Sequence, residues 1–137
     1  MRIPATLRLA LLLTPLLLIA ACSSQAPQKP APADHAVLEE LAQAYRKVGE
    51  DYPMQPQAMA PEGRKEFVSR VFAEAGYDFS ASLIALARPG ADRTNQDQRD
   101  LAELLLLPSR GLSDDALARL YTADERKSIQ QLRTIFR

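Results

Sequence analysis

The sequence carries few side chains with reactive chemistry. It contains one cysteine, Cys22, and one histidine, His35. These are too few for a zinc site of cysteines and histidines or for a disulfide framework. His35 lies where the first helix is expected to begin, and a general base there would also need a nucleophile and an orienting group nearby. We therefore interpret His35 as an exposed residue at a helix start and expect no catalytic role for it.

The carboxylates are numerous, but their spacing is typical of solvated helix faces and first helical turns. Acid–base catalysis on glycans needs two carboxyl groups that face one cleft. Asp97, Asp100 and Glu103 recur every three residues and could together contact a cation, although a charged helix face is the simpler interpretation. The sequence also lacks a G-x-S-x-G elbow, an S-x-x-K pattern and a glycine-rich phosphate loop. We expect no catalytic residue, no metal and no cofactor.

Cys22 directly follows an apolar segment near the start of the chain. Arg2 and Arg8 supply positive charge, and residues 9–19 form an apolar run. A run of this length suits a signal peptide and is well short of the roughly 20 residues that a membrane-spanning helix needs. The segment therefore predicts export of the chain.

The residues Ile19-Ala20-Ala21-Cys22 resemble the lipobox of bacterial lipoproteins, in which a branched apolar residue and two small residues precede an obligatory cysteine. In that class the cysteine is acylated with fatty acids such as palmitate, and the chain is cut before it. The resemblance covers residues 1–24 and implies a permanent anchor on Cys22, because each buried methylene contributes about 0.8 kcal/mol. An ordinary signal peptide cleaved after small residues is the alternative.

Ser23 follows the cysteine. In bacteria with two membranes, an aspartate at this position tends to hold a lipoprotein at the inner membrane. Ser23 and Ser24 resemble the pattern that permits export, which implies the periplasmic face of the outer membrane. The full chain has 17 basic and 17 acidic side chains, so no net charge directs it to nucleic acid, and we expect no such partner.

Three segments follow from this interpretation: a signal peptide over 1–21, a lipidated cysteine with a flexible tether over 22–33, and a helical periplasmic domain over 34–137. Residues 23–33 read SSQAPQKPAPA. Proline and small residues without a large apolar side chain cannot bury a core, and they favour an extended chain. At about 3.1 Å per residue, this tether would reach roughly 30 Å.

The domain itself is predicted to be all-α, a small bundle of five or six short helices. Apolar residues recur with helical spacing from Asp34 onward, and no long stretch alternates with a period of two. Thr122 and Glu125 have the spacing of a capping box. The other expected helix starts are Asp34, Pro61, Asp78 or Ser80, Asp92 or Thr94, and Ser113.

Two apolar segments are candidate partner-binding surfaces. The first is the loop over 52–61, which carries Tyr52, Met54 and Met59. Methionine adapts to irregular partners, and long loops are often functional. The second is a run of four leucines, from which we select Leu104, Leu106 and Leu107, because such a run covers more than one helix face. The simpler interpretations are a loop folded over the core and a helix at the centre of the bundle.

Together these features favour a lipid-anchored, non-catalytic envelope protein that binds another envelope component or assists its assembly. In size and organisation the chain is similar to the α-helical pilotin lipoproteins, which bring secretin subunits to the outer membrane. The cysteine pair that pilotins commonly carry is absent, and no functional residue is transferred. The alternatives are an inhibitor- or immunity-type lipoprotein that blocks a periplasmic enzyme, and a small enzyme that acts on peptidoglycan with two carboxylates in a tyrosine-lined cleft.

Overall fold

The computed structural model describes residues 28–137, and within this range the protein is a bundle of α-helices without strands. The predicted all-α fold is confirmed. The predicted signal peptide, the residues 19–22 that resemble a lipobox, and Ser23 lie outside the described residues. No helix within residues 28–137 combines the length and the apolarity needed to cross a membrane. The six α-helices are α2 (His35–Gly49), α3 (Pro61–Glu74), α4 (Phe79–Leu86), α5 (Gln96–Leu106), α6 (Asp114–Leu120) and α7 (Ala123–Ile135), with short 3-10 helices at Pro56–Ala58 and Leu107–Ser109.

The helices begin at side chains that satisfy free backbone N–H groups. The Asp34 carboxylate accepts a hydrogen bond from the Ala36 N–H at 2.8 Å. The capping box of α7 is also present. The Glu125 N–H donates to the Thr122 hydroxyl at 3.2 Å, and the Thr122 N–H donates to the Glu125 carboxylate at 2.8 Å.

The start of α5 differs from the prediction, because Asn95 and not Asp92 or Thr94 caps this helix. The Asn95 side-chain oxygen accepts a hydrogen bond from the Gln98 N–H at 3.0 Å. Asp92 instead accepts from both the N–H and the hydroxyl of Thr94, at 2.9 and 2.7 Å. These hydrogen bonds lower the pKa of Asp92 and close a turn before the helix. Asp92 and Thr94 are therefore engaged with each other and do not cap α5.

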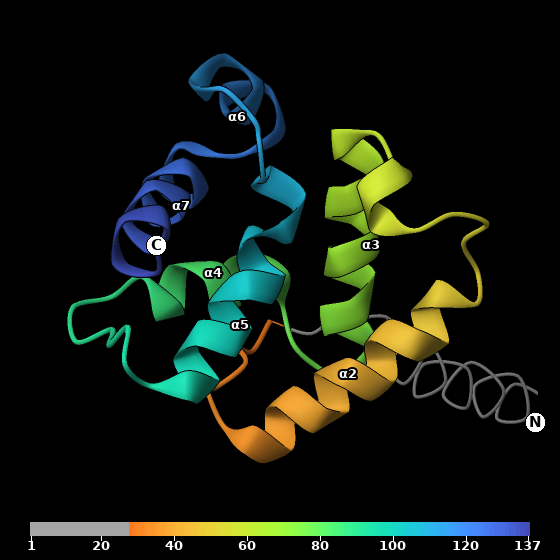
Figure 1. Cartoon of the computed structure of the whole chain (residues 1–137), viewed down its shortest axis with the longest axis horizontal. Helices are drawn as coiled ribbons and strands as arrows, with labels where there is room; N and C mark the ends of the chain where they lie inside the picture. Colours follow the sequence, from red (N-terminus) through yellow and green to blue (C-terminus); the bar gives the residue numbers. More distant parts are fainter. Residues whose placement is uncertain (1–27) are drawn as a thin grey trace, which may run out of the picture.

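The helices α3 and α4 connect the two sides of the bundle. The helix α3 lies beside α5 in Figure 1. It contacts α2, α4 and the Leu107–Ser109 turn, while α4 contacts α5 and α7, and α6 contacts α7. In Figure 1, α2 crosses the lower end of α3, and α4 and α7 lie on the other side of α5. A single core joins these helices, and its fully buried large side chains include Phe67, Phe72, Leu41, Leu83, Leu101, Leu105, Leu117, Ile129 and Leu132.

The end of the predicted tether belongs to the folded domain. Ala31 is 5% exposed, and its N–H donates a hydrogen bond to the Ser82 hydroxyl of α4 at 2.8 Å. The Lys29 carbonyl accepts from the Asp78 N–H at 2.8 Å, and the Lys29 ammonium lies 5.1 Å from the centre of the Tyr77 ring. The predicted boundary at residue 33 is therefore too late. One small side chain and two backbone hydrogen bonds hold this segment, and a composition argument that looks for large apolar residues does not detect them.

Candidate functional site

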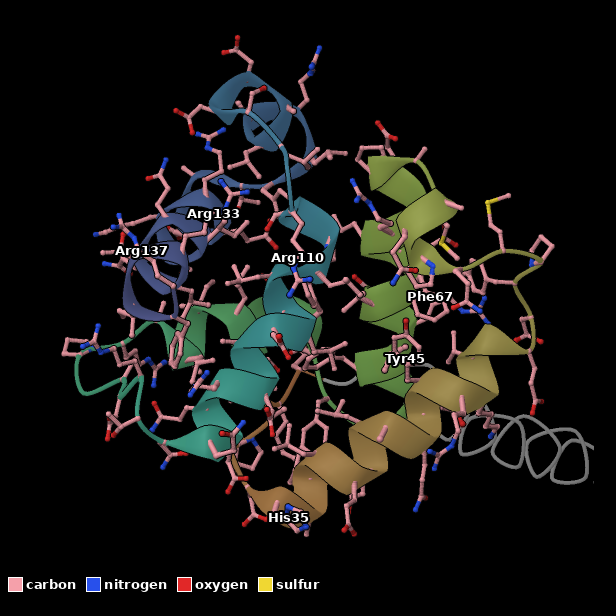
Figure 2. All side chains as sticks on the ribbon, in the orientation of Figure 1. His35, Tyr45, Phe67, Arg110, Arg133 and Arg137 are labelled. Atoms are coloured by element: carbon pink, nitrogen blue, oxygen red, sulfur yellow. The ribbon has the colours of Figure 1, made fainter. Side chains whose placement is uncertain are left out.

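A hollow of about 500 Å³ lies between α2, the chain that follows it, and α3. We call it the aromatic groove, because Tyr45, Tyr52 and Phe67 line it together with Met54. Figure 2 shows Tyr45 of α2 beside Phe67 of α3, where the two helices meet. The groove is thus formed by residues from two helices and from the first candidate segment.

The three rings form a continuous edge-to-face stack. The Phe67 ring centre lies 5.0 Å from that of Tyr45 and 5.0 Å from that of Tyr52, and both pairs of planes meet at 82°. Phe67 is buried at 1% exposure, whereas both tyrosines are half-buried. Aromatic pairs in this geometry contribute about 0.5–1.5 kcal/mol each beyond the area that they bury. The buried phenylalanine therefore holds two partly accessible tyrosine rings in fixed positions.

Tyr52 is held from the other side by Arg70 of α3. One guanidinium nitrogen donates to the Tyr52 hydroxyl at 3.3 Å, and the other donates to the Asp51 carboxylate at 3.1 Å. The guanidinium carbon also lies 5.4 Å from the centre of the Tyr52 ring. The hydrogen bond that Arg70 donates to Tyr52, followed by its interaction with Asp51, raises the pKa of Arg70. A backbone hydrogen bond also helps to position Tyr52. The Tyr52 N–H donates to the Gly49 carbonyl at 3.2 Å in the turn that follows α2.

The two methionines of the predicted loop have different environments. Met59 is half-buried and packs against the core, as the simpler interpretation expects. Met54 is 51% exposed, and among residues 28–137 it is the one large apolar side chain that is exposed to solvent. Pro56, which lies between them in the sequence, is buried. The second half of the loop is therefore anchored, and its first half presents Met54 at the edge of the aromatic groove.

The leucine run is mainly part of the core. Leu105 is fully buried, and Leu104, Leu106 and Leu107 are half-buried against the core. Four consecutive leucines are accommodated because α5 contacts α2, α4, α7 and the Leu107–Ser109 turn. Leu106 also lines a second cavity, between α5 and α7, which has no lining residue in common with the aromatic groove. The structure therefore does not bring the two candidate segments together.

The side chains considered for catalysis or metal binding lie on the surface. His35 is exposed, and its Nε2 lies 3.2 Å from the carboxylate of Glu39, one helical turn further on. Asp100 accepts a hydrogen bond from Gln96 at 2.7 Å, and Glu103 lies 3.8 Å from Arg110. In the part of the chain that the structure describes, no three His, Cys, Asp or Glu side chains are grouped so that they could hold a metal ion.

Sequence reasoning found Tyr52 and Met54 but missed the partners that position them. Tyr45 and Phe67 are not among the candidate residues that the sequence indicates. Tyr45 is half-buried because it lies at the edge of the apolar stripe of α2 and not at its centre. A tyrosine at such an edge, followed by an aromatic residue in the next loop, is the signal that could have indicated the groove.

The fold and the groove define a small all-α domain with a rigid aromatic hollow on its surface. No model of a known protein family matches the chain, and the comparisons with curated proteins and with solved structures found no match.

Proposed function

We propose that the protein is a lipid-anchored accessory protein of the bacterial outer membrane, which binds another envelope protein and has no catalytic activity of its own. The anchored location rests on the lipobox Ile19-Ala20-Ala21-Cys22. The observation that carries the binding role is the exposed Met54 beside the fixed rings of Tyr45 and Tyr52.

A protein segment with an apolar side chain is the partner that suits this groove. Aromatic residues, methionine and arginine are enriched at the centres of protein interfaces, and buried aromatic anchors dominate their binding energy. Tyr45 and Tyr52 are already held by Phe67, so little conformational freedom would be lost when a partner binds. The Tyr45 hydroxyl can donate a hydrogen bond at neutral pH, because a tyrosine titrates only near pH 10. Burial raises the pKa of Tyr45 further.

The anchor would place the groove close to the membrane. With Cys22 lipidated, residues 23–28 are all that separate the anchor from Lys29, which is attached to the domain. Six residues span at most about 20 Å. The partner would then be met near the lipid surface, where anchoring of both proteins raises their effective concentration.

Site-specific photocrosslinking in the native envelope tests the binding role. A photoreactive amino acid replaces Met54 at the groove, and in a matched control it replaces Arg93, which is exposed in the loop before α5. We expect one discrete envelope protein to be crosslinked from position 54 and not from position 93. Tyr52→Ala should reduce that crosslink at least fivefold. Identical products from both positions, or no product from position 54, would contradict the proposed binding role.

The anchor is tested separately with Cys22→Ser. We expect this variant to accumulate as an unprocessed precursor that incorporates no palmitate. Unchanged palmitate labelling of Cys22→Ser would refute the lipoprotein assignment and leave the groove hypothesis standing.

A further inference from the structure

The second cavity, between α5 and the end of α7, has a different chemistry from the aromatic groove. It has a volume of about 390 Å³ and is lined by four arginines, Arg99, Arg110, Arg133 and Arg137. We call it the arginine cleft. Figure 2 shows Arg133 on α7, Arg137 just beyond the end of α7, and Arg110 across from them, beyond the end of α5.

The arginine cleft has an excess of positive charge. Besides the four guanidinium groups, two carboxylates line it, those of Asp100 and Glu103. Asp100 accepts a hydrogen bond from Gln96 at 2.7 Å, and Glu103 lies 3.8 Å from Arg110 in a long, exposed pair. The lining therefore carries two more positive than negative side chains. Within residues 28–137, neither Arg99 nor Arg137 forms an ion pair, so the donors of both are available to a ligand.

One arginine of the cleft is fixed by the fold. Arg133 is half-buried, and its guanidinium donates a hydrogen bond to the carbonyl of Ser109. Ser109 is itself fully buried, and its hydroxyl donates to the Leu106 carbonyl at 3.0 Å. The turn that follows α5 and the last turns of α7 are thereby locked together, and this lock holds the two walls of the cleft in place.

Two of the lining side chains are apolar, Leu106 and Phe136, and both are half-buried against the core. We call this pair the apolar floor of the cleft. A ligand that fits would therefore combine an anionic group, held by the arginines at the rim, with a less polar portion that lies against these two side chains. A volume of about 390 Å³ lies within the range of small-molecule sites.

We propose that the arginine cleft binds a phosphate group. The guanidinium fork matches pairs of phosphate or carboxylate oxygens. The lining side chains have an excess of two positive charges, which a phosphomonoester with about two negative charges balances and a single carboxylate does not. This inference goes beyond the proposed function and is independent of it, because the cleft and the aromatic groove share no residue.

The phosphate group that binds could belong to the headgroup of a lipid or to a soluble compound. Two probes distinguish them: inorganic pyrophosphate represents the soluble source, and dihexanoyl phosphatidic acid represents the lipid. Dihexanoyl phosphatidylcholine, whose phosphate is masked by choline, serves as the control ligand. Binding of each to the full chain in nonionic detergent is measured by isothermal titration calorimetry.

The variants separate the cleft from general charge effects. Arg99→Gln with Arg137→Gln removes two exposed arginines of the cleft without touching the Arg133–Ser109 lock. Arg93→Gln with Arg119→Gln removes two exposed arginines that do not line the cleft, with the same change in net charge. We expect the cleft double variant to bind the phosphate probes at least tenfold more weakly than the wild type. The control double variant should change this affinity by less than twofold.

The outcomes decide both the site and the source. Tighter binding of dihexanoyl phosphatidic acid than of pyrophosphate, by tenfold or more, assigns a lipid headgroup, and comparable or weaker binding assigns a soluble phosphate. The proposal is overturned if neither phosphate probe binds at millimolar concentration, or if both double variants weaken binding equally. Phosphatidylcholine binding as tight as that of phosphatidic acid also overturns it, because the apolar floor alone would then account for the affinity.

Discussion

The aromatic groove and the arginine cleft lie on different helices and are held in place in different ways. Phe67, which positions the groove, is among the most buried side chains of the core, at 1% exposure. Three of the four arginines of the cleft, Arg99, Arg110 and Arg137, are exposed. A substitution of Phe67 would therefore change the groove and also destabilise the domain. Substitutions of the three exposed arginines would change the cleft with little effect on the stability of the domain.

This difference has a physical origin. Apolar rings keep a fixed position only where they pack against other buried atoms, so a rigid aromatic surface must extend from the core. Arginines are always charged and reach a ligand from exposed helix ends, so they need little support from the core. Arg133 is the exception, because its hydrogen bond to Ser109 connects the cleft to a buried turn.

The strongest test of this comparison is Phe67→Ala. Removal of a fully buried ring leaves a cavity beneath two tyrosines, and truncations of this kind cost about 3–5 kcal/mol. We expect a loss of this size in the free energy of unfolding, measured by urea denaturation and circular dichroism. Arg99→Gln, as the matched change in the cleft, should cost less than about 0.5 kcal/mol. Equal losses for the two variants would remove the distinction between the cavities.

The helices could be predicted from the sequence because their signals are local. Caps such as Asp34, Ser113 and Thr122 act within three residues of their position, and each starts the helix that was expected. Asn95 was missed because Asp92 offers the same capping chemistry, and only the turn that Asp92 forms with Thr94 decides between them.

The cavities could be predicted only in part. The loop composition indicated Tyr52 and Met54, which do line the aromatic groove. The arginine cleft has no local signal, because Arg99 and Arg133 are far apart in the sequence and meet only where α5 packs against α7. Periodicity gives the face of a helix on which a residue lies but not the helix that will oppose it. Cavities between helices therefore require the tertiary structure.

A second prediction concerns the lock between the cleft and the core. In Arg133→Gln the buried Ser109 carbonyl loses a hydrogen bond from a charged donor, which costs about 1–3 kcal/mol. Arg137→Gln removes the same charge one turn further on, where the side chain is exposed, and should cost less than about 0.5 kcal/mol. Chemical denaturation of both variants makes the comparison. A loss no larger for Arg133→Gln than for Arg137→Gln would show that the lock does not stabilise the domain.

The smallest predicted effect concerns the pKa of the buried Tyr121, to which Arg133 of the arginine cleft contributes. Burial, followed by the charge of Glu125, raises the pKa of Tyr121 to about 12, while Arg64 and Arg133 oppose the shift. The Lys65 ammonium also lies 4.6 Å from the centre of this ring. The unfolded chain releases the phenolic proton near pH 10 and the folded chain near pH 12, so this contribution to stability is complete below pH 10 and is lost as the pH rises toward 12.

Tyr121→Phe isolates this contribution, because it removes the titrating group and keeps the ring. The Tyr121 hydroxyl is buried without a hydrogen-bond partner among the described residues, so the variant should be as stable as the wild type at pH 7. Between pH 10 and 12 the free energy of unfolding of the wild type should fall more steeply than that of the variant. The difference at pH 11 should be on the order of 1 kcal/mol or less, because solvent screening reduces the effect. Parallel curves from pH 9 to 12 would contradict the prediction, because they would mean that the Tyr121 hydroxyl has the same pKa in the folded and the unfolded chain.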